Sequence, residues 1–129
     1  MKKPKINAYG LKGWELPYET RKRVYWLVRD YPRIKQEYED LLTDTPAHDG
    51  QPGSSSPGDP TQRVAIRRAR LAEDVQAVEK ALQYISEEDA REIMRHLAKR
   101  KEYTVPAHRN TWQNRMKPFL YMVAIIRGY

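Results

Sequence analysis

The chain has 129 residues, of which 40% are hydrophobic and 32% charged, and its net charge is +7 at neutral pH. This length allows one small hydrophobic core, so we expect a single globular unit with flexible parts. The chain contains no cysteine, which excludes disulfides, thiolate zinc sites and a cysteine nucleophile. No stretch approaches the roughly 18 consecutive apolar residues of a membrane helix, and the basic start lacks the apolar core of a signal peptide. We therefore expect a cytoplasmic protein without a membrane segment.

Two segments precede a polar linker. Residues 1–17 contain two prolines, two glycines and four lysines, which predicts an extended arm held at Trp14. In the next segment apolar residues recur near the helical period. Because Pro32 lacks a backbone amide and readily starts a helix, we predict a break there and a hairpin of two helices over residues 18–42.

The predicted hairpin is rich in aromatic side chains. Such side chains either bridge a core and the solvent, which we favour, or form a surface that binds another protein. They are Tyr18, Tyr25, Trp26, Tyr31 and Tyr38.

Residues 43–60 read TDTPAHDGQPGSSSPGDP and contain no aliphatic residue larger than alanine. Such a composition cannot bury enough apolar surface to offset the entropy lost on ordering. We predict a flexible linker between the hairpin and residues 61–129.

The segment 61–129 predicts three helices, which we interpret as a helix-turn-helix-like DNA-binding module. The first helix, over residues 62–85, has neither glycine nor proline. Its apolar residues step by three and four and form a heptad seam, which predicts a coiled-coil dimer or, as we favour, packing within the chain. The seam consists of Leu71, Val75, Val78, Leu82 and Ile85.

The other two helices are predicted from their start signals. Ser86, followed by three acidic residues, predicts the N-cap of a helix that reaches about Lys99. Pro106 predicts the start of the last helix, and Pro118 is expected to kink or divide it, because proline cannot donate a backbone hydrogen bond. With the N-terminal hairpin, these elements give an all-α fold of about five helices.

The last helix has two chemically different faces before Pro118. Wound as a helix, Trp112 and Met116 fall on one side and polar side chains on the other. Arg, Asn and Gln make paired hydrogen bonds to guanine and adenine in the major groove of DNA. We therefore predict double-stranded DNA as the partner, with base contacts from Arg109, Asn110, Gln113 and Asn114.

Positive charge is concentrated at the C-terminal end of the chain. Residues 94–129 contain eight lysines and arginines and one acid, so they account for the whole excess of +7. A concentrated positive field favours nucleic acid or another polyanion. We predict phosphate contacts from Lys99, Arg100, Lys101, Arg115 and Lys117.

Several short motifs follow one another in a recognisable order. A segment with Tyr31-Pro32, Ile34, Tyr38 and Glu39 precedes the polar linker, a long helix, the sequence SEEDAREIM, the motif Y-x-V-P-x-x-x-x-T-W-x-x-R and the end FLYMVA. This order, over residues 18–127, resembles small phage and prophage transcriptional regulators of the RinA and ArpU type. The resemblance implies a helix-turn-helix like that of domain 4 of bacterial sigma factors, with RNA polymerase as a second partner. In the sigma-like arrangement a short helix precedes the recognition helix, whereas only Arg100–Val105 occupy that interval here.

No catalytic or metal site is predicted. The histidines His48, His96 and His108 share no metal-binding spacing on one helix, and capping explains the acids after Ser86. No Gly-rich phosphate loop or nucleophile motif is visible. We therefore predict a DNA-binding regulator without enzyme activity or cofactor, acting as a monomer or homodimer. Two other classes stay open, a protein-binding adaptor or structural protein and a small DNA-packaging component like the small subunit of terminase.

Overall fold

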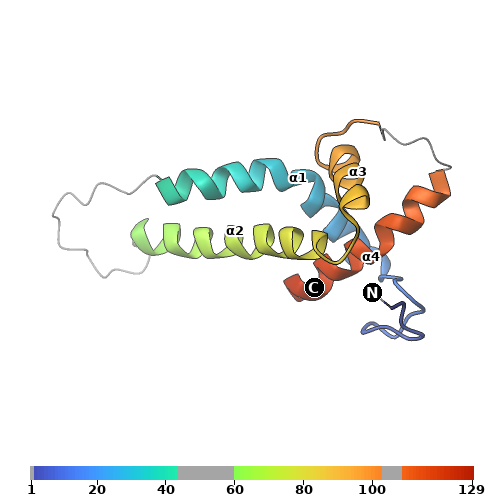
Figure 1. The fold of residues 1–129 in the computed structure, drawn as a ribbon. Helices are drawn as coiled ribbons and strands as arrows, with labels where there is room; N and C mark the ends of the chain where they lie inside the picture. The colour runs from blue at the N-terminus through green and yellow to red at the C-terminus, as the bar shows by residue number, and fades with distance from the viewer. Residues whose placement is uncertain (1, 44–59, 103–108) are drawn as a thin grey trace.

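Helices make up the regular secondary structure of the part of the chain that the structure describes. The structure is a computed structural model and describes residues 2–43, 60–102 and 109–129. The helices are α1 (Tyr18–Thr43), α2 (Pro60–Leu82), α3 (Glu87–Leu97) and α4 (Arg109–Arg127) (Figure 1). The all-α class is confirmed, and the described residues form four helices rather than about five.

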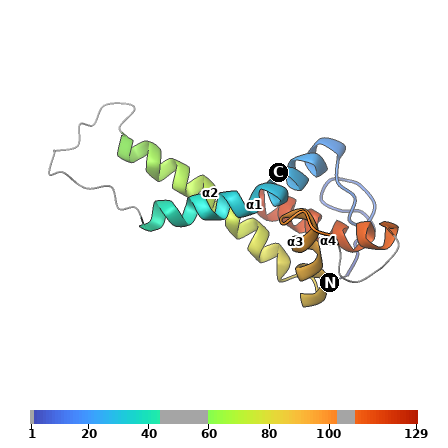
Figure 2. The ribbon, with the colours of Figure 1, turned by 90° about the horizontal axis from the view of Figure 1, so that it is seen from above.

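The predicted break at Pro32 is wrong, because α1 runs through this proline as one helix. A proline inside a helix removes one backbone hydrogen bond and bends the axis, and α1 changes direction in two perpendicular views (Figures 1 and 2). The helix continues because Val28 and Ile34, on either side of the proline, are buried in the same core. The N-terminal hairpin predicted over residues 18–42 is therefore a single long helix.

α1 and α2 lie side by side and project together beyond the other helices (Figures 1 and 2). The seam predicted on α2 is used inside the chain, since Leu71, Val75 and Val78 are buried and Leu82 is half-buried against the core. The predicted linker lies outside the described residues except at its two ends.

α3 begins at the cap that the sequence predicts. The Ser86 hydroxyl accepts a hydrogen bond from the Asp89 backbone amide at 3.2 Å. Three acidic residues fill the first turn, where they face the positive end of the helix dipole. On the inner face Ile93 and Leu97 are buried, and the helix ends at Leu97 rather than near Lys99.

α4 packs against α2 and α1 and completes the core. Pro118 lies inside α4 without dividing it, and the predicted start at Pro106 lies outside the described residues. One hydrophobic core joins the arm and all four of these helices, as shown by Leu16, Val24, Val78, Ile93 and Phe119. This core therefore contains side chains from both sides of the predicted linker.

Candidate nucleic-acid interface

The N-terminal half of α4, residues 109–117, has the two faces that the sequence predicts. Trp112 is only 2% exposed, and Met116 is also buried. The opposite side carries exposed amide side chains, which we call the amide stripe: Asn110, Gln113 and Asn114. The side chain of Arg109 lies outside the described part of the chain.

Two ion pairs show which way the amide stripe faces. The Arg115 guanidinium pairs with Asp89, at the start of α3, with an N–O distance of 3.5 Å. Lys117 Nζ donates a hydrogen bond to Glu15 Oε1 of the arm at 2.8 Å. Side chains two residues apart point to nearly opposite sides of a helix, whereas those three, four or seven apart share a side. Asn110, Gln113 and Asn114 lie seven, four and three residues before Lys117, so they share the side of α4 on which Lys117 contacts the arm. The amide stripe therefore faces the side of the arm and points away from α3.

Arg115, predicted to contact phosphate, is held by structural partners. Its guanidinium carbon lies 5.0 Å from the centre of the Trp112 ring, in addition to the ion pair with Asp89. A cation over an indole face is a favourable contact, worth about 0.5–1 kcal/mol at an exposed site. The structure thus places Arg115 where it links α4 to α3 and helps to fix the orientation of α4.

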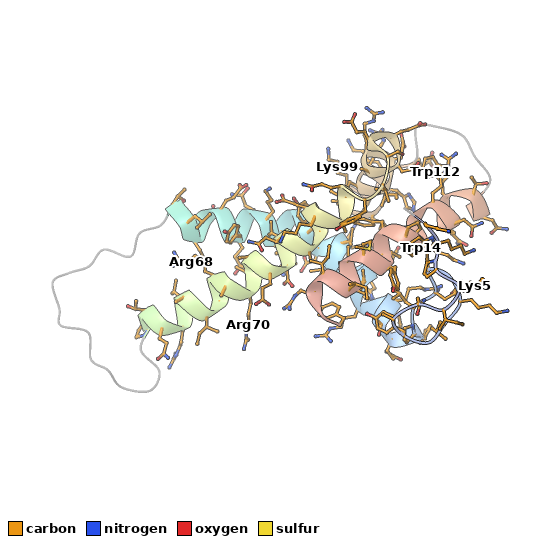
Figure 3. All side chains as sticks on the ribbon, turned by 60° about the horizontal axis from the view of Figure 1, so that its bottom comes forward. Lys5, Trp14, Arg68, Arg70, Lys99 and Trp112 are labelled. Atoms are coloured by element: carbon orange, nitrogen blue, oxygen red, sulfur yellow. The ribbon has the colours of Figure 1, made fainter. Side chains whose placement is uncertain are left out.

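The second predicted phosphate cluster, Lys99–Lys101, follows the last turn of α3. The Lys101 amide donates a hydrogen bond to the Arg95 carbonyl at 3.0 Å, and Arg100 has a φ of 55°, the left-handed conformation common after a helix end. All three side chains are exposed. However, Lys99 and the arm lie on opposite sides of α4 (Figure 3). The structure therefore does not bring this cluster next to the amide stripe.

The basic C-terminal segment is partly neutralised by acids from earlier in the chain. Arg127 Nε donates a hydrogen bond to Asp74 at 2.6 Å, and Arg127 also pairs with Glu73 at 2.9 Å. Together with the pairs of Arg115 and Lys117, at least three of the eight basic residues in this segment have acidic partners. The charge counted along the sequence overstates the positive surface that this segment offers.

The prediction from sequence missed how the arm docks on α4. Residues 2–17, predicted to be extended, fold into a compact turn around Asn7, whose buried side chain donates to two backbone carbonyls at 3.0 and 2.6 Å. The Trp14 ring then packs on the Tyr121 ring of α4, with 5.3 Å between the ring centres. In the sequence, Asn7 near two glycines indicates a turn, and Trp14 indicates a residue that anchors the arm. Neither feature reveals which helix the arm contacts.

The described ranges show no metal centre and no membrane helix. No group of three metal-ligating side chains is found within them, and none of their helices is long and apolar enough to cross a membrane. His96 Nδ1 instead lies 3.2 Å from the Lys101 carbonyl oxygen, while His48 and His108 lie outside these ranges.

Comparisons with models of protein families, with curated proteins and with solved structures find no match. Function must therefore be inferred from the site itself. Its hydrogen-bonding groups stand on the convex surface of a helix that is anchored by a buried tryptophan and fixed by ion pairs on two sides. This arrangement is typical of a helix that binds in a groove of another macromolecule.

Proposed function

We propose that the chain binds double-stranded DNA and that the N-terminal half of α4 enters the major groove as a recognition helix. The observation that carries this proposal is the amide stripe, three exposed amides on a helix whose other face is anchored by Trp112 and Met116. An α-helix fits the major groove, and Asn or Gln can make two hydrogen bonds to the edge of adenine. Because the buried face already holds the helix, little ordering remains to oppose binding.

Phosphate contacts are assigned to basic side chains around the recognition helix. Lys99, Arg100 and Lys101 are exposed at the end of α3, but the amide stripe faces away from α3, so we assign to them phosphates outside the groove that the stripe enters. Lys117 and Arg115 are held by carboxylates, so they exchange an existing partner when they approach a phosphate. We assign to these two residues mainly the orientation of α4.

Within the DNA-binding proteins, we propose a transcriptional regulator of the phage type. The support is the order of motifs over residues 18–127, which resembles the RinA and ArpU regulators and implies RNA polymerase as a further partner. A DNA-packaging component is the competing class. The mass of the protein in solution separates the two classes, since packaging subunits assemble into rings of many copies whereas a regulator acts as a monomer or dimer.

Selection of duplexes from a random-sequence pool, followed by fluorescence anisotropy, tests the proposal. We expect enrichment of one class of sequence, bound more tightly than a scrambled duplex and with a steep salt dependence. In the double variant Asn110→Ala, Gln113→Ala the preference for the selected duplex should fall by about tenfold or more, since each amide–adenine pair contributes about 1–3 kcal/mol of discrimination.

The matched control is Gln62→Ala, Gln76→Ala, which removes two exposed amides from α2 and should leave the preference unchanged. Circular dichroism of both double variants checks that the helices persist. An unchanged ratio of the selected and scrambled affinities in the α4 variant would show that the amide stripe does not contact bases.

An exposed aromatic face on α1 favours protein binding as a second candidate function. Trp26 is 57% exposed and Tyr18 is 64% exposed, and the Arg29 guanidinium lies 5.2 Å from the centre of the Trp26 ring. Trp, Tyr and Arg are the side chains most enriched at the centres of protein interfaces. Tyr31 and Tyr38, on the same helix, instead pack against the core. If the chain binds no duplex at low salt, the protein-binding adaptor becomes the leading proposal.

A further inference from the structure

The arm sits on the same stripe of α4 that carries the amides. Lys117 and Tyr121 continue the spacing of Asn114 along one side of the helix. The arm covers both residues, because Glu15 accepts a hydrogen bond from Lys117 at 2.8 Å and the Ala8 amide donates to the Tyr121 hydroxyl at 3.1 Å. A duplex that lies along the amide stripe therefore meets the arm at the C-terminal end of that stripe.

The arm is held in a defined conformation. The Asn7 amide donates a hydrogen bond to the Leu11 carbonyl at 2.8 Å, and the Asn7 side-chain oxygen accepts from the Tyr9 amide at 2.8 Å. At its far edge the Tyr9 hydroxyl donates to the Tyr129 carbonyl at 2.7 Å. The backbone of this turn consequently keeps a fixed position relative to α4, so only its exposed side chains have to be ordered on binding.

The arm is also basic and carries little compensating charge. Lys2, Lys5 and Lys12 are exposed, and no ion pair among the described residues involves them. Glu15 is the only acid before Glu19 in the chain, and it is already paired with Lys117. Figure 3 shows Lys5 on the side of α4 away from Lys99.

We propose that the arm is a second DNA contact, in which Lys2, Lys5 and Lys12 bind the phosphate backbone beside the groove that the amide stripe enters. This inference rests on the proposed DNA binding. It reassigns the phosphate contact on this side of α4 from the C-terminal segment to the N-terminal turn. Backbone contacts position a protein on a duplex without selecting its sequence, so the arm strengthens binding to every duplex alike.

The test is the triple variant Lys2→Gln, Lys5→Gln, Lys12→Gln, titrated with selected and scrambled duplexes at several salt concentrations. Lys3 is kept because its side chain packs over Gly13. Each phosphate contact contributes about 0.9 to the slope of log affinity against log salt. We therefore expect the slope to shrink by about 2–3 and both affinities to fall by a similar factor, with their ratio unchanged.

The matched control removes the same charge from the projecting end of α2, with Arg63→Gln, Arg68→Gln and Arg70→Gln. These arginines are exposed, and Figure 3 shows Arg68 and Arg70 far from the arm. The control should keep most of the wild-type salt slope. If both triple variants lost the same amount of salt slope and affinity, the arm lysines would act only through the net charge of the protein, and the inference would be overturned.

The remaining outcomes separate the arm from the recognition helix. If the arm variant keeps the wild-type slope while Asn110→Ala, Gln113→Ala loses its sequence preference, the arm does not contact DNA and the proposed function stands. If the wild-type chain binds no duplex at low salt, both proposals fail together. Unfolding midpoints of the two triple variants, expected to match the wild type because only exposed side chains change, show that any loss concerns binding.

Discussion

The two ends of the α1–α2 pair differ in what holds them together. In the body, where α4 packs on the pair, large side chains such as Val28 and Phe119 are fully buried. The distal pair, residues 35–43 of α1 and 60–70 of α2, contains no fully buried side chain among its described residues. One sequence pattern, a long helix with apolar residues at helical spacing, thus produces a packed region and an open one, depending on whether a third helix covers it.

Polar contacts supplement a smaller apolar contact in the distal pair, where Tyr38 and Leu41 are only half-buried against the core. Arg67 of α2 pairs with Glu37 of α1, while Leu42 and Ile66 remain 52% and 48% exposed. An exposed ion pair contributes about 0–1 kcal/mol, whereas full burial of one large apolar side chain contributes about 1.5–3 kcal/mol. The body therefore carries most of the stability, and the distal pair is the part expected to open first.

The largest effect should come from Phe119→Ala, which deletes a fully buried ring where α4 meets the core. Large-to-small changes of this kind cost about 3–5 kcal/mol through lost burial and a residual cavity. The matched change in the distal pair, Leu42→Ala, removes a half-exposed side chain and should cost about 0.5 kcal/mol or less. Urea unfolding followed by circular dichroism measures both, and similar costs would show that the two ends are equally packed.

An intermediate effect is expected from Tyr31, which stands where the body gives way to the distal pair. Burial and the hydrogen bond that Tyr31 donates to Glu79, at 2.7 Å, raise the pKa of Tyr31 to about 12. Lys35 also pairs with Glu79, and this contact raises the pKa of Lys35. Because the pKa of an unfolded tyrosine is near 10, the unfolded chain loses the Tyr31 proton before the folded chain does.

The stabilisation linked to the Tyr31 proton is therefore complete below about pH 10 and is lost as the pH rises towards about 12. Tyr31→Phe should cost about 1 kcal/mol at neutral pH, for the lost hydrogen bond to a carboxylate, and should flatten the decline above pH 10. Unfolding midpoints of the wild type and the variant, measured from neutral pH to about pH 12, test this prediction. Burial also raises the pKa of Tyr9, which is present in both the wild type and the Tyr31→Phe variant. If the stability of both proteins declined equally steeply above pH 10, Tyr31 would not be the cause of the decline.

The buried faces of α2, α3 and α4 were predictable because periodicity alone decides which side chains of a helix share a side. Leu71, Val75 and Val78 of the seam on α2 and the pair Trp112 and Met116 on α4 are buried as expected, and the Ser86 cap needs only local sequence. The break at Pro32 was wrong because the local rule for proline competes with burial on both sides of it. That competition is decided by helices distant in sequence, which no window of sequence contains.

The candidate site was predictable in its composition and not in its surroundings. The sequence shows that amides and an indole occupy opposite faces of one helix, and the structure confirms that arrangement for the described side chains. The sequence does not show that Lys117 pairs with Glu15 or Arg127 with Asp74, because these partners lie far apart along the chain. Summed charge placed the positive field at the C-terminal end. Among the described residues, ion pairs engage at least three of the eight basic residues there and none of the arm residues Lys2, Lys5 and Lys12.

The smallest effect should come from Arg67→Gln, which removes the ion pair that joins the two helices of the distal pair. Exposed pairs of this kind are worth about 0.2–1 kcal/mol and are screened by salt. Global stability should therefore change by less than about 1 kcal/mol, and the difference should vanish in about 1 M salt. Hydrogen exchange is the sharper measurement, since amides of residues 60–70 should exchange faster in the variant while those of residues 71–82 stay as protected as in the wild type.

The matched control is Arg63→Gln, an exposed change one turn earlier that breaks no ion pair among the described residues. It should leave the exchange of both segments unaffected. Equal acceleration along all of α2 would mean that the helix opens as one unit, and the distinction between a packed body and an open distal pair would not hold.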